Sequence, residues 1–208
     1  MNMELFNELS QFILETSIKY KIDETHNISH SMNVLHLAHA IYEMELQTNP
    51  SIVAHKKIIY LAAALHDMCD KKYMNEAEGL AEINAFLNYK ITDDESAAIA
   101  SIFTTMSYSK VKQYGFPDLG IYQRAYHVVR EADLLTAYDF DRCMIYHMKV
   151  NHGNFKDSFY KAEELFQHRV FRHAEDNLFR TDYALEQYPG LHDQAMDRIK
   201  TWKKILNI

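Results

Sequence analysis

The chain has 208 residues, of which 48% are hydrophobic, so it is long enough for one substantial core and short for two independent ones. Its formal net charge of −7 argues against a surface that holds duplex nucleic acid, although a local basic pocket for one small phosphorylated ligand remains compatible with it. Only five glycines and three prolines occur, which is scarce turn chemistry for a sandwich or barrel, and we expect a single all-α domain over 1–208.

Apolar residues recur at helical spacing along the chain, and each set predicts one buried helix face. The first two sets are Leu5, Leu9, Phe12 and Ile13, then Val34, Leu37, Ala38 and Ile41. A continuous apolar run follows at 58–65. Thr92 and Glu95 have the spacing of a capping box and open the next helix, whose face holds Ile99, Ile102, Phe103 and Met106.

Two stretches of the second half are predicted to interrupt helices. Gly115, Pro117 and Gly120 make 107–120 the least helical segment, and we expect a loop there, over the site. Pro189 and Gly190 are expected to break the chain again. A last helix then follows, with Met196, Ile199, Trp202, Ile205 and Leu206 on its buried side, within C-terminal helices at about 154–206.

The ionisable pair His66 and Asp67 ends the apolar run at 58–65. Burying such a pair unpaired costs several kcal/mol, so it must meet a metal, a partner or water. His30 lies at the predicted start of a helix, and Asp133 follows another apolar stretch, so three helices are expected to converge on one point. The four residues then form a metal shell; the alternative is that each caps a helix or forms an ordinary ion pair.

A set of two histidines and two aspartates suits several divalent ions and leaves open positions for water. We therefore expect a divalent metal cofactor, with Mn, Co, Ni, Fe, Mg and Zn left open. A metal-bound water loses its proton more easily than bulk water, by roughly eight pKa units in the best zinc sites. Such a water attacks phosphorus at neutral pH, which points to metal-dependent hydrolysis.

The order of His30, then His66 with Asp67, then Asp133 resembles the signature of the HD superfamily of metal-dependent phosphohydrolases. The likeness is closest to the small bacterial-type hydrolases related to the YpgQ nucleotide pyrophosphohydrolases and extends from about 23 to 185, with a core signature at about 23–140. The segments that carry it are DETHNISHSMNV, LAAALHDMCDKKY, MSYSKVK and VREADLLTAYDFDR. The resemblance implies a helical bundle with the metal near its centre.

The last motif of this chain departs from that subgroup. Where the subgroup usually reads like DADRLDA, the chain has EADLLTA at 131–137. Asp133 is kept, but Leu134 and Thr136 stand at the Arg-like and second Asp-like positions. The departure leaves the predicted metal ligand in place and changes the residues around it.

Five further residues are candidates for work on the substrate. By the resemblance, Asp70 is expected to transfer protons to or from the nucleophilic water or leaving group, and Lys72 to neutralise phosphate oxygens. Lys110 and Arg130 are candidate phosphate ligands, because a charged substrate needs local cations in an acidic protein. His26 is expected to orient the first ligand or to bind substrate. The alternatives are a helix cap for Asp70, a surface lysine for Lys72 and a loop histidine for His26.

The expected function is hydrolysis of a phosphate or pyrophosphate bond in a nucleotide or similar small phosphorylated metabolite. The alternatives are a phosphodiesterase for cyclic or short linear nucleotides, a di-iron HD oxygenase, and a non-catalytic module that binds metal or nucleotide. Cys69 and Cys143 form no CxxC pair, and no apolar run approaches membrane-spanning length, so we expect a cytoplasmic protein without a membrane partner. A homodimer is compatible with the long helical chain.

Overall fold

The computed structural model describes residues 1–150 and 152–208, and within them the chain is all-α, as predicted, with no strand. The α-helices are α1 (Met3–Tyr20), α2 (Ile28–Thr48), α3 (Lys56–Leu65), α4 (Glu76–Leu87), α5 (Asp93–Thr105), α6 (Tyr108–Tyr114), α7 (Gln123–Thr136), α8 (Phe140–Val150), α9 (Phe155–His168) and α10 (Asp182–Leu206). Short 3-10 turns lie at Pro50–His55, Gly120–Tyr122 and Val170–Arg172. Among the helices of the described ranges, none is both long enough and apolar enough to span a membrane.

Side-chain caps set where several helices begin. The Asn2 side chain accepts a hydrogen bond from the third residue beyond it and starts α1. Thr92 and Glu95 form the predicted capping box at α5, with both reciprocal bonds present. Thr181 caps α10 through its hydroxyl. These caps satisfy backbone N–H groups that have no partner inside the helix.

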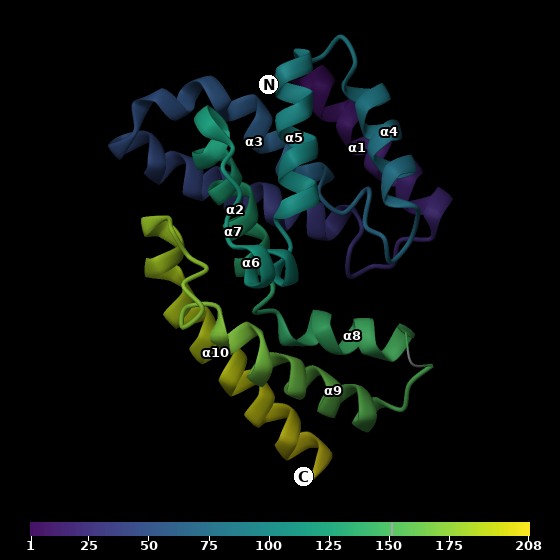
Figure 1. The fold of residues 1–208 in the computed structure, drawn as a ribbon. Helices are drawn as coiled ribbons and strands as arrows, with labels where there is room; N and C mark the ends of the chain where they lie inside the picture. Colours follow the sequence, from purple (N-terminus) through teal and green to yellow (C-terminus); the bar gives the residue numbers. More distant parts are fainter. Residues whose placement is uncertain (151) are drawn as a thin grey trace.

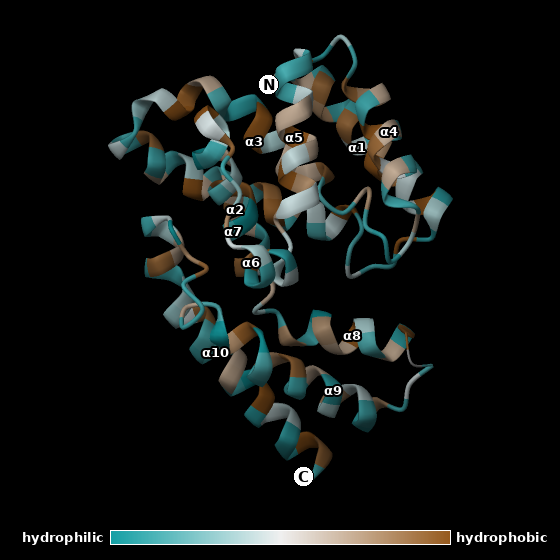
Figure 2. Cartoon of the chain, in the orientation of Figure 1, coloured by the Kyte–Doolittle hydropathy of each residue, from teal (hydrophilic) through white to brown (hydrophobic). Residues whose placement is uncertain are grey.

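Helices α2 and α7 form the centre of the bundle, and α3 packs against both (Figure 1). Helices α1, α4 and α5 lie on one side of this centre, and α8, α9 and α10 on the other (Figure 1). One continuous core of buried side chains includes members of every helix from α1 to α10, as a single domain requires. Hydrophobic and hydrophilic residues are interleaved along the helices (Figure 2), and α3 is buried along the whole predicted run at 58–65.

The predicted break at Pro189 and Gly190 is wrong, because α10 runs through both residues. A proline inside a helix costs about 3 kcal/mol through a lost hydrogen bond and a clash with the preceding turn. Here buried contacts on both sides of the proline hold the helix together, with Ala184 before it and Ala195 and Ile199 after it. The buried face beyond the proline is as predicted at Ile199, whereas Ile205, also assigned to it, is 60% exposed.

The stretch at 107–120 is only partly a loop. The side chain of Ser107 caps the short helix α6, and Gly115, with φ of 78°, follows its last residue. A left-handed backbone of this kind suits glycine, which has no Cβ to clash. The glycine therefore ends a helix that the sequence pattern had missed, and the first part of this segment approaches the candidate site as a helix.

Candidate metal centre

Three helices bring the four predicted metal ligands to one point. His30 lies in the first turn of α2, His66 and Asp67 directly follow α3, and Asp133 lies in the last turn of α7. The two Nε2 atoms of His30 and His66 are 3.2 Å apart. Asp67 Oδ2 is 3.3 Å from each of them, and Asp133 Oδ1 is 3.4 Å from His30 Nε2 and 3.6 Å from His66 Nε2. The expected convergence is therefore present in the fold.

Three members of the cluster are buried, the Asp133 side chain is 35% exposed, and the charges of the four act on one another. His30 is 3% exposed, and His66 and Asp67 are each 8% exposed. Burial by itself lowers the pKa of His66, but the neighbouring carboxylates of Asp67 and Asp133 outweigh it and raise that pKa well above its usual value. Burial by itself raises the pKa values of Asp67 and Asp133, but the two imidazoles lower both well below the usual range. The carboxylates are thus held in the ionised form that a cation requires.

The donor set fits a divalent cation. His66 Nδ1 lies 2.9 Å from the carbonyl oxygen of Ala63, so this nitrogen donates, and Nε2 is the nitrogen that would turn its lone pair to a bound ion. Asp67 Oδ2 is buried and receives no hydrogen bond of acceptable geometry, although two imidazole nitrogens lie near it. Asp67 Oδ2 is thus a buried acceptor without a donor, and the two imidazole nitrogens beside it face each other. A cation bound among these three atoms would give each of them a partner.

The cluster forms part of the wall of a cavity of about 470 Å³. The segment before α2, the turn after α3, the start of α4, the end of α5, the start of α6, and parts of α8 and α9 also contribute to the wall. Asp70, Lys72, Lys110 and His26 all line this cavity, so the structure gathers four of the five candidate substrate residues around the predicted ligands.

Asp70 and Lys72 are partners. The Asp70 carboxylate accepts a hydrogen bond of 2.9 Å from the backbone N–H of Lys72 and lies 3.3 Å from the ammonium of the same residue. The alternative interpretation of Asp70 as the cap of the following helix does not hold, because Asn75 caps α4. Lys72 Nζ also lies 3.3 Å from His26 Nε2.

Lys110 lines the cavity but is engaged elsewhere. Its ammonium donates to the carbonyl oxygen of Thr104 at 2.7 Å and lies 3.6 Å from the carboxylate of Glu76. The Lys110 charge is therefore partly offset by a carboxylate before any substrate arrives.

The structure contradicts the prediction that Arg130 binds phosphate. Arg130 is fully buried and does not line the cavity. One of its guanidinium nitrogens donates to the carbonyl oxygen of Leu178 at 2.6 Å, and the group lies over the ring of Phe116 at 5.0 Å. Arg130 lies about one helical turn before the predicted ligand Asp133, but the two side chains point to different places. Arg130 faces the contact of α7 with the segment before α10, whereas Asp133 faces the cavity.

His26 reaches the site although it precedes α2, whose cap is Asn27. Its Nδ1 lies 2.9 Å from the Tyr73 hydroxyl and 2.7 Å from the Thr25 hydroxyl, and its ring centroid is 6.0 Å from that of His30. Burial lowers the pKa of His26. The residue thus stands beside the first ligand without belonging to the same helix.

Sequence reasoning missed two arginines that line the cavity, Arg142 at the start of α8 and Arg169 just after α9, and also Lys71 beside Lys72. Arg142 Nη1 lies 2.9 Å from both the Thr25 carbonyl oxygen and His30 Nδ1. The Arg169 guanidinium carbon lies 4.7 Å from the centre of the Tyr108 ring. The one available signal was the short distance of Arg142 from Asp133 along the chain; nothing in the sequence singled out Arg169.

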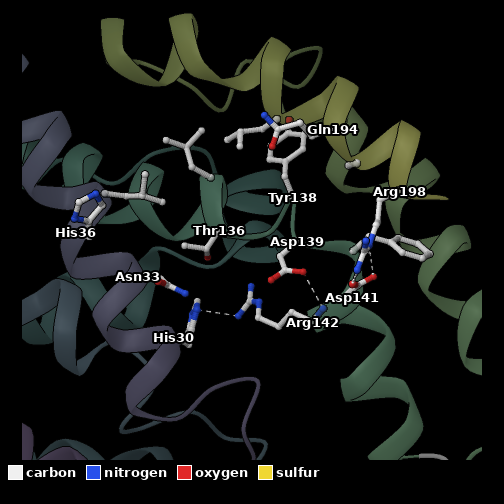
Figure 3. Close-up of a pocket in the computed structure, with 15 residues that line it drawn as sticks. His30, Asn33, His36, Thr136, Tyr138, Asp139, Asp141, Arg142, Gln194 and Arg198 are labelled. Carbon is white, nitrogen blue, oxygen red and sulfur yellow. Dashed lines mark hydrogen bonds and ion pairs between the residues drawn. The ribbon is translucent and has the colours of Figure 1, made fainter. Parts of the chain in front are cut away.

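A second cavity of about 500 Å³ lies between α2, the start of α8 and α10. It shares His30, Asp139 and Arg142 with the first cavity. Figure 3 shows the Arg142 side chain extended toward His30, with Asp139 beside it. Arg142 therefore stands at the boundary of two cavities and touches a predicted metal ligand.

Comparisons with known proteins bear on the fold. No protein-family profile matches the chain, and no curated protein matches it. The fold is similar to the crystal structure of a structural-genomics target from Lactobacillus plantarum, with a TM-score of 0.73 and 21% sequence identity, over 99% of this chain and 98% of that one. At this identity the likeness shows a shared all-helical fold that extends over nearly the whole of both chains.

Proposed function

We propose that this protein is a metal-dependent phosphohydrolase that acts on a nucleotide or a similarly small phosphorylated metabolite. The observation that carries the proposal is the meeting of two imidazoles and two carboxylates, with contacts of 3.2 to 3.6 Å, at the wall of a cavity that contains several cationic side chains. The order of these ligands in the chain resembles the HD superfamily and supports the same reading.

In this proposal His30, His66, Asp67 and Asp133 hold the ion. When bound, a divalent ion supplies Lewis acidity and lowers the pKa of a water molecule that it binds. The ionised state of both carboxylates, held by the adjacent imidazoles, prepares the site for a cation. His66 would bind the ion through Nε2, because its other nitrogen donates to a backbone carbonyl.

The residues around the cluster are assigned the roles of proton transfer and substrate binding. Asp70 lines the cavity and is the candidate for moving a proton to or from the reacting groups, with Lys72 holding its carboxylate in place. Lys72 and Lys110 also supply positive charge near a phosphate group. His26, whose pKa is lowered by burial, offers a neutral imidazole nitrogen for hydrogen bonding to a substrate.

The size of the cavity agrees with a small substrate. Its volume of about 470 Å³ falls within the range of roughly 300–1,000 Å³ that is usual for small-molecule sites. The lining combines polar and charged groups with apolar surface from Phe103, Met106 and Leu165. Such a lining suits a ligand with a phosphate group and an apolar or aromatic body.

The test is a hydrolysis assay on metal-stripped protein that is resupplied with Mn²⁺, Co²⁺, Ni²⁺, Mg²⁺ or Zn²⁺ in turn. The substrates are nucleoside triphosphates, deoxynucleoside triphosphates, monophosphates and cyclic nucleotides, with products resolved by chromatography. We expect release of phosphate or pyrophosphate that Asp67→Ala abolishes while its helical circular dichroism is retained. Asp193→Ala, which removes a carboxylate that is 85% exposed, is the matched control and should keep full activity.

Two results contradict the proposal. Turnover that survives in Asp67→Ala shows that the cluster is not the catalytic centre. Nucleotide binding without product for any of the five metals favours the non-catalytic binding module instead.

A further inference from the structure

The lysines and arginines that line the metal-side cavity are Lys71, Lys72, Lys110, Arg142 and Arg169, of which Lys71 is exposed to solvent. Lys72 is paired with Asp70, and Lys110 with Glu76, at 3.3 and 3.6 Å. In the described ranges 1–150 and 152–208, Arg142 and Arg169 line the same cavity without any carboxylate at ion-pair distance. The charges of these two arginines are therefore available to an anion, whereas those of the two lysines are already partly offset.

The hydrogen bonds of the Arg142 guanidinium go to a backbone carbonyl and an imidazole. One nitrogen of its guanidinium, Nη1, makes both contacts, with the Thr25 carbonyl oxygen and with His30 Nδ1. Its backbone N–H donates to the Asp139 side chain, which fixes the first turn of α8 without engaging the guanidinium. A guanidinium carries five N–H donors in a planar fork, and most of those of Arg142 are not used.

The contact with His30 is incompatible with metal binding by the same ring. In the present contact Arg142 donates, so His30 Nδ1 accepts and the ring proton is on Nε2. When Nε2 is the metal ligand its lone pair must face the ion, and the proton then belongs on Nδ1. Two donors, Arg142 N–H and His30 Nδ1–H, then face each other at 2.9 Å, and the contact turns from favourable to repulsive.

His66 shows the arrangement that a metal ligand requires, because its Nδ1 faces the carbonyl oxygen of Ala63, an acceptor. The difference between the two histidines makes Arg142 the group that has to move. A divalent ion held by Asp67 and Asp133 is neutralised by these two carboxylates, so a phosphate group beside it still needs cations of its own. Arg142 and Arg169 are the unpaired arginines on the wall of that cavity.

We infer that Arg142 leaves His30 when the metal binds and then, together with Arg169, binds the phosphate group of the substrate. This inference rests on the proposed function for the class of substrate. It assigns to Arg142 and Arg169 the phosphate-binding role that the sequence had suggested for Lys110 and Arg130. Planar arginine forks bind phosphate oxygens through paired hydrogen bonds, which sets the orientation of the group as well as its affinity.

The test uses four variants of the full chain, with folding checked by circular dichroism and thermal unfolding. Arg142→Gln removes the charge and offers an oxygen that accepts from His30 Nδ1–H, whereas Arg142→Lys keeps a donor-only cation. Arg169→Gln removes the second cation. Arg172→Gln is the matched control, because this arginine is half exposed, pairs with Glu175 and lies outside both cavities.

Two affinities are measured by calorimetry, that of Mn²⁺ for metal-stripped protein and that of inorganic phosphate for Mn²⁺-loaded protein. For Arg142→Gln we expect Mn²⁺ to bind about 10-fold more tightly, because His30 gains an acceptor partner, and phosphate to bind about 10- to 100-fold more weakly. Arg142→Lys should leave Mn²⁺ affinity near that of the wild type. Arg169→Gln should weaken phosphate binding alone, and Arg172→Gln should change neither affinity.

Weaker Mn²⁺ binding in Arg142→Gln, or phosphate affinity unchanged in both glutamine variants, overturns the inference. These outcomes are separate from the failure of the proposed function. If both affinities shift as expected but no phosphorylated compound is turned over, the arginine roles stand and the hydrolase proposal falls. If hydrolysis occurs while both affinities of Arg142→Gln equal those of the wild type, only the arginine roles fall.

Discussion

Glu131 links the helix that carries Asp133 to the start of α10, and this link can be tested by replacing one oxygen atom. Glu131 lies in α7 and is fully buried. Its Oε1 accepts from the backbone N–H of Arg180 at 2.8 Å, and its Oε2 accepts from the backbone N–H and the hydroxyl of Thr181 at 2.9 and 2.8 Å. Because Thr181 caps α10, one carboxylate fixes where the last helix begins.

The substitution Glu131→Gln keeps the shape and replaces one acceptor by an amide that only donates. The less costly orientation turns the amide toward the Arg180 N–H and loses one bond to a charged group, about 1.5–3 kcal/mol. The two bonds to Thr181 become neutral ones and lose roughly 0.5 kcal/mol each. The expected total is about 3 kcal/mol, which for a chain of this length lowers the melting temperature by roughly 6–12 °C.

Thermal and urea unfolding followed by circular dichroism measure this effect. Glu175→Gln is the control, since the Glu175 side chain is 69% exposed and pairs with the exposed Arg172, and it should change stability by less than about 0.5 kcal/mol. A melting temperature of Glu131→Gln within 2 °C of the wild type refutes the reasoning. That result means that desolvation of the buried carboxylate costs as much free energy as its three hydrogen bonds contribute to stability.

Two further predictions concern buried titratable groups. Burial, reinforced by the Arg169 and Arg130 charges, lowers the pKa of His173 to about 3. As the pH falls below 6.5, this histidine therefore binds a proton in the unfolded chain but not in the folded chain. The free energy of unfolding that is present above pH 6.5 is lost as the pH falls toward 3. His173→Phe should reduce this loss by about 2 kcal/mol between pH 7 and pH 5, measured by urea unfolding, and an equal loss in both proteins rejects the assignment. Burial also raises the pKa of Cys143 to about 11 and that of Cys69 to about 12, so neither thiol should react with a disulfide reagent at pH 8 until denaturant is added, and rapid reaction of the folded protein contradicts this.

The parts of the fold that follow from local patterns were predictable. The apolar run at 58–65 is buried along its whole length, and Thr92 with Glu95 starts α5 as a capping box. The four predicted ligands meet because each lies at or near the end of a helix that packs in the centre of the bundle. Their role as metal ligands stays a prediction, although the geometry fits it.

The parts that depend on contacts distant in sequence were not predictable. Pro189 breaks isolated helices, but packing on both sides of it keeps α10 continuous. Arg130 lies three residues before a ligand, yet its side chain reaches the Leu178 carbonyl, a contact fixed only by how the C-terminal segment folds back. Arg142, in α8, and Arg169, just after α9, come beside the cluster only in the folded chain, so no local pattern marks them among 22 basic residues.

The most direct test of the central claim is anomalous X-ray diffraction from crystals of the protein soaked in Mn²⁺, collected at the manganese absorption edge. The account predicts one strong peak within about 2.0–2.3 Å of His30 Nε2, His66 Nε2 and carboxylate oxygens of Asp67 and Asp133, and its loss in Asp67→Ala. A crystal with full Mn²⁺ occupancy elsewhere and no peak among these four side chains contradicts the account.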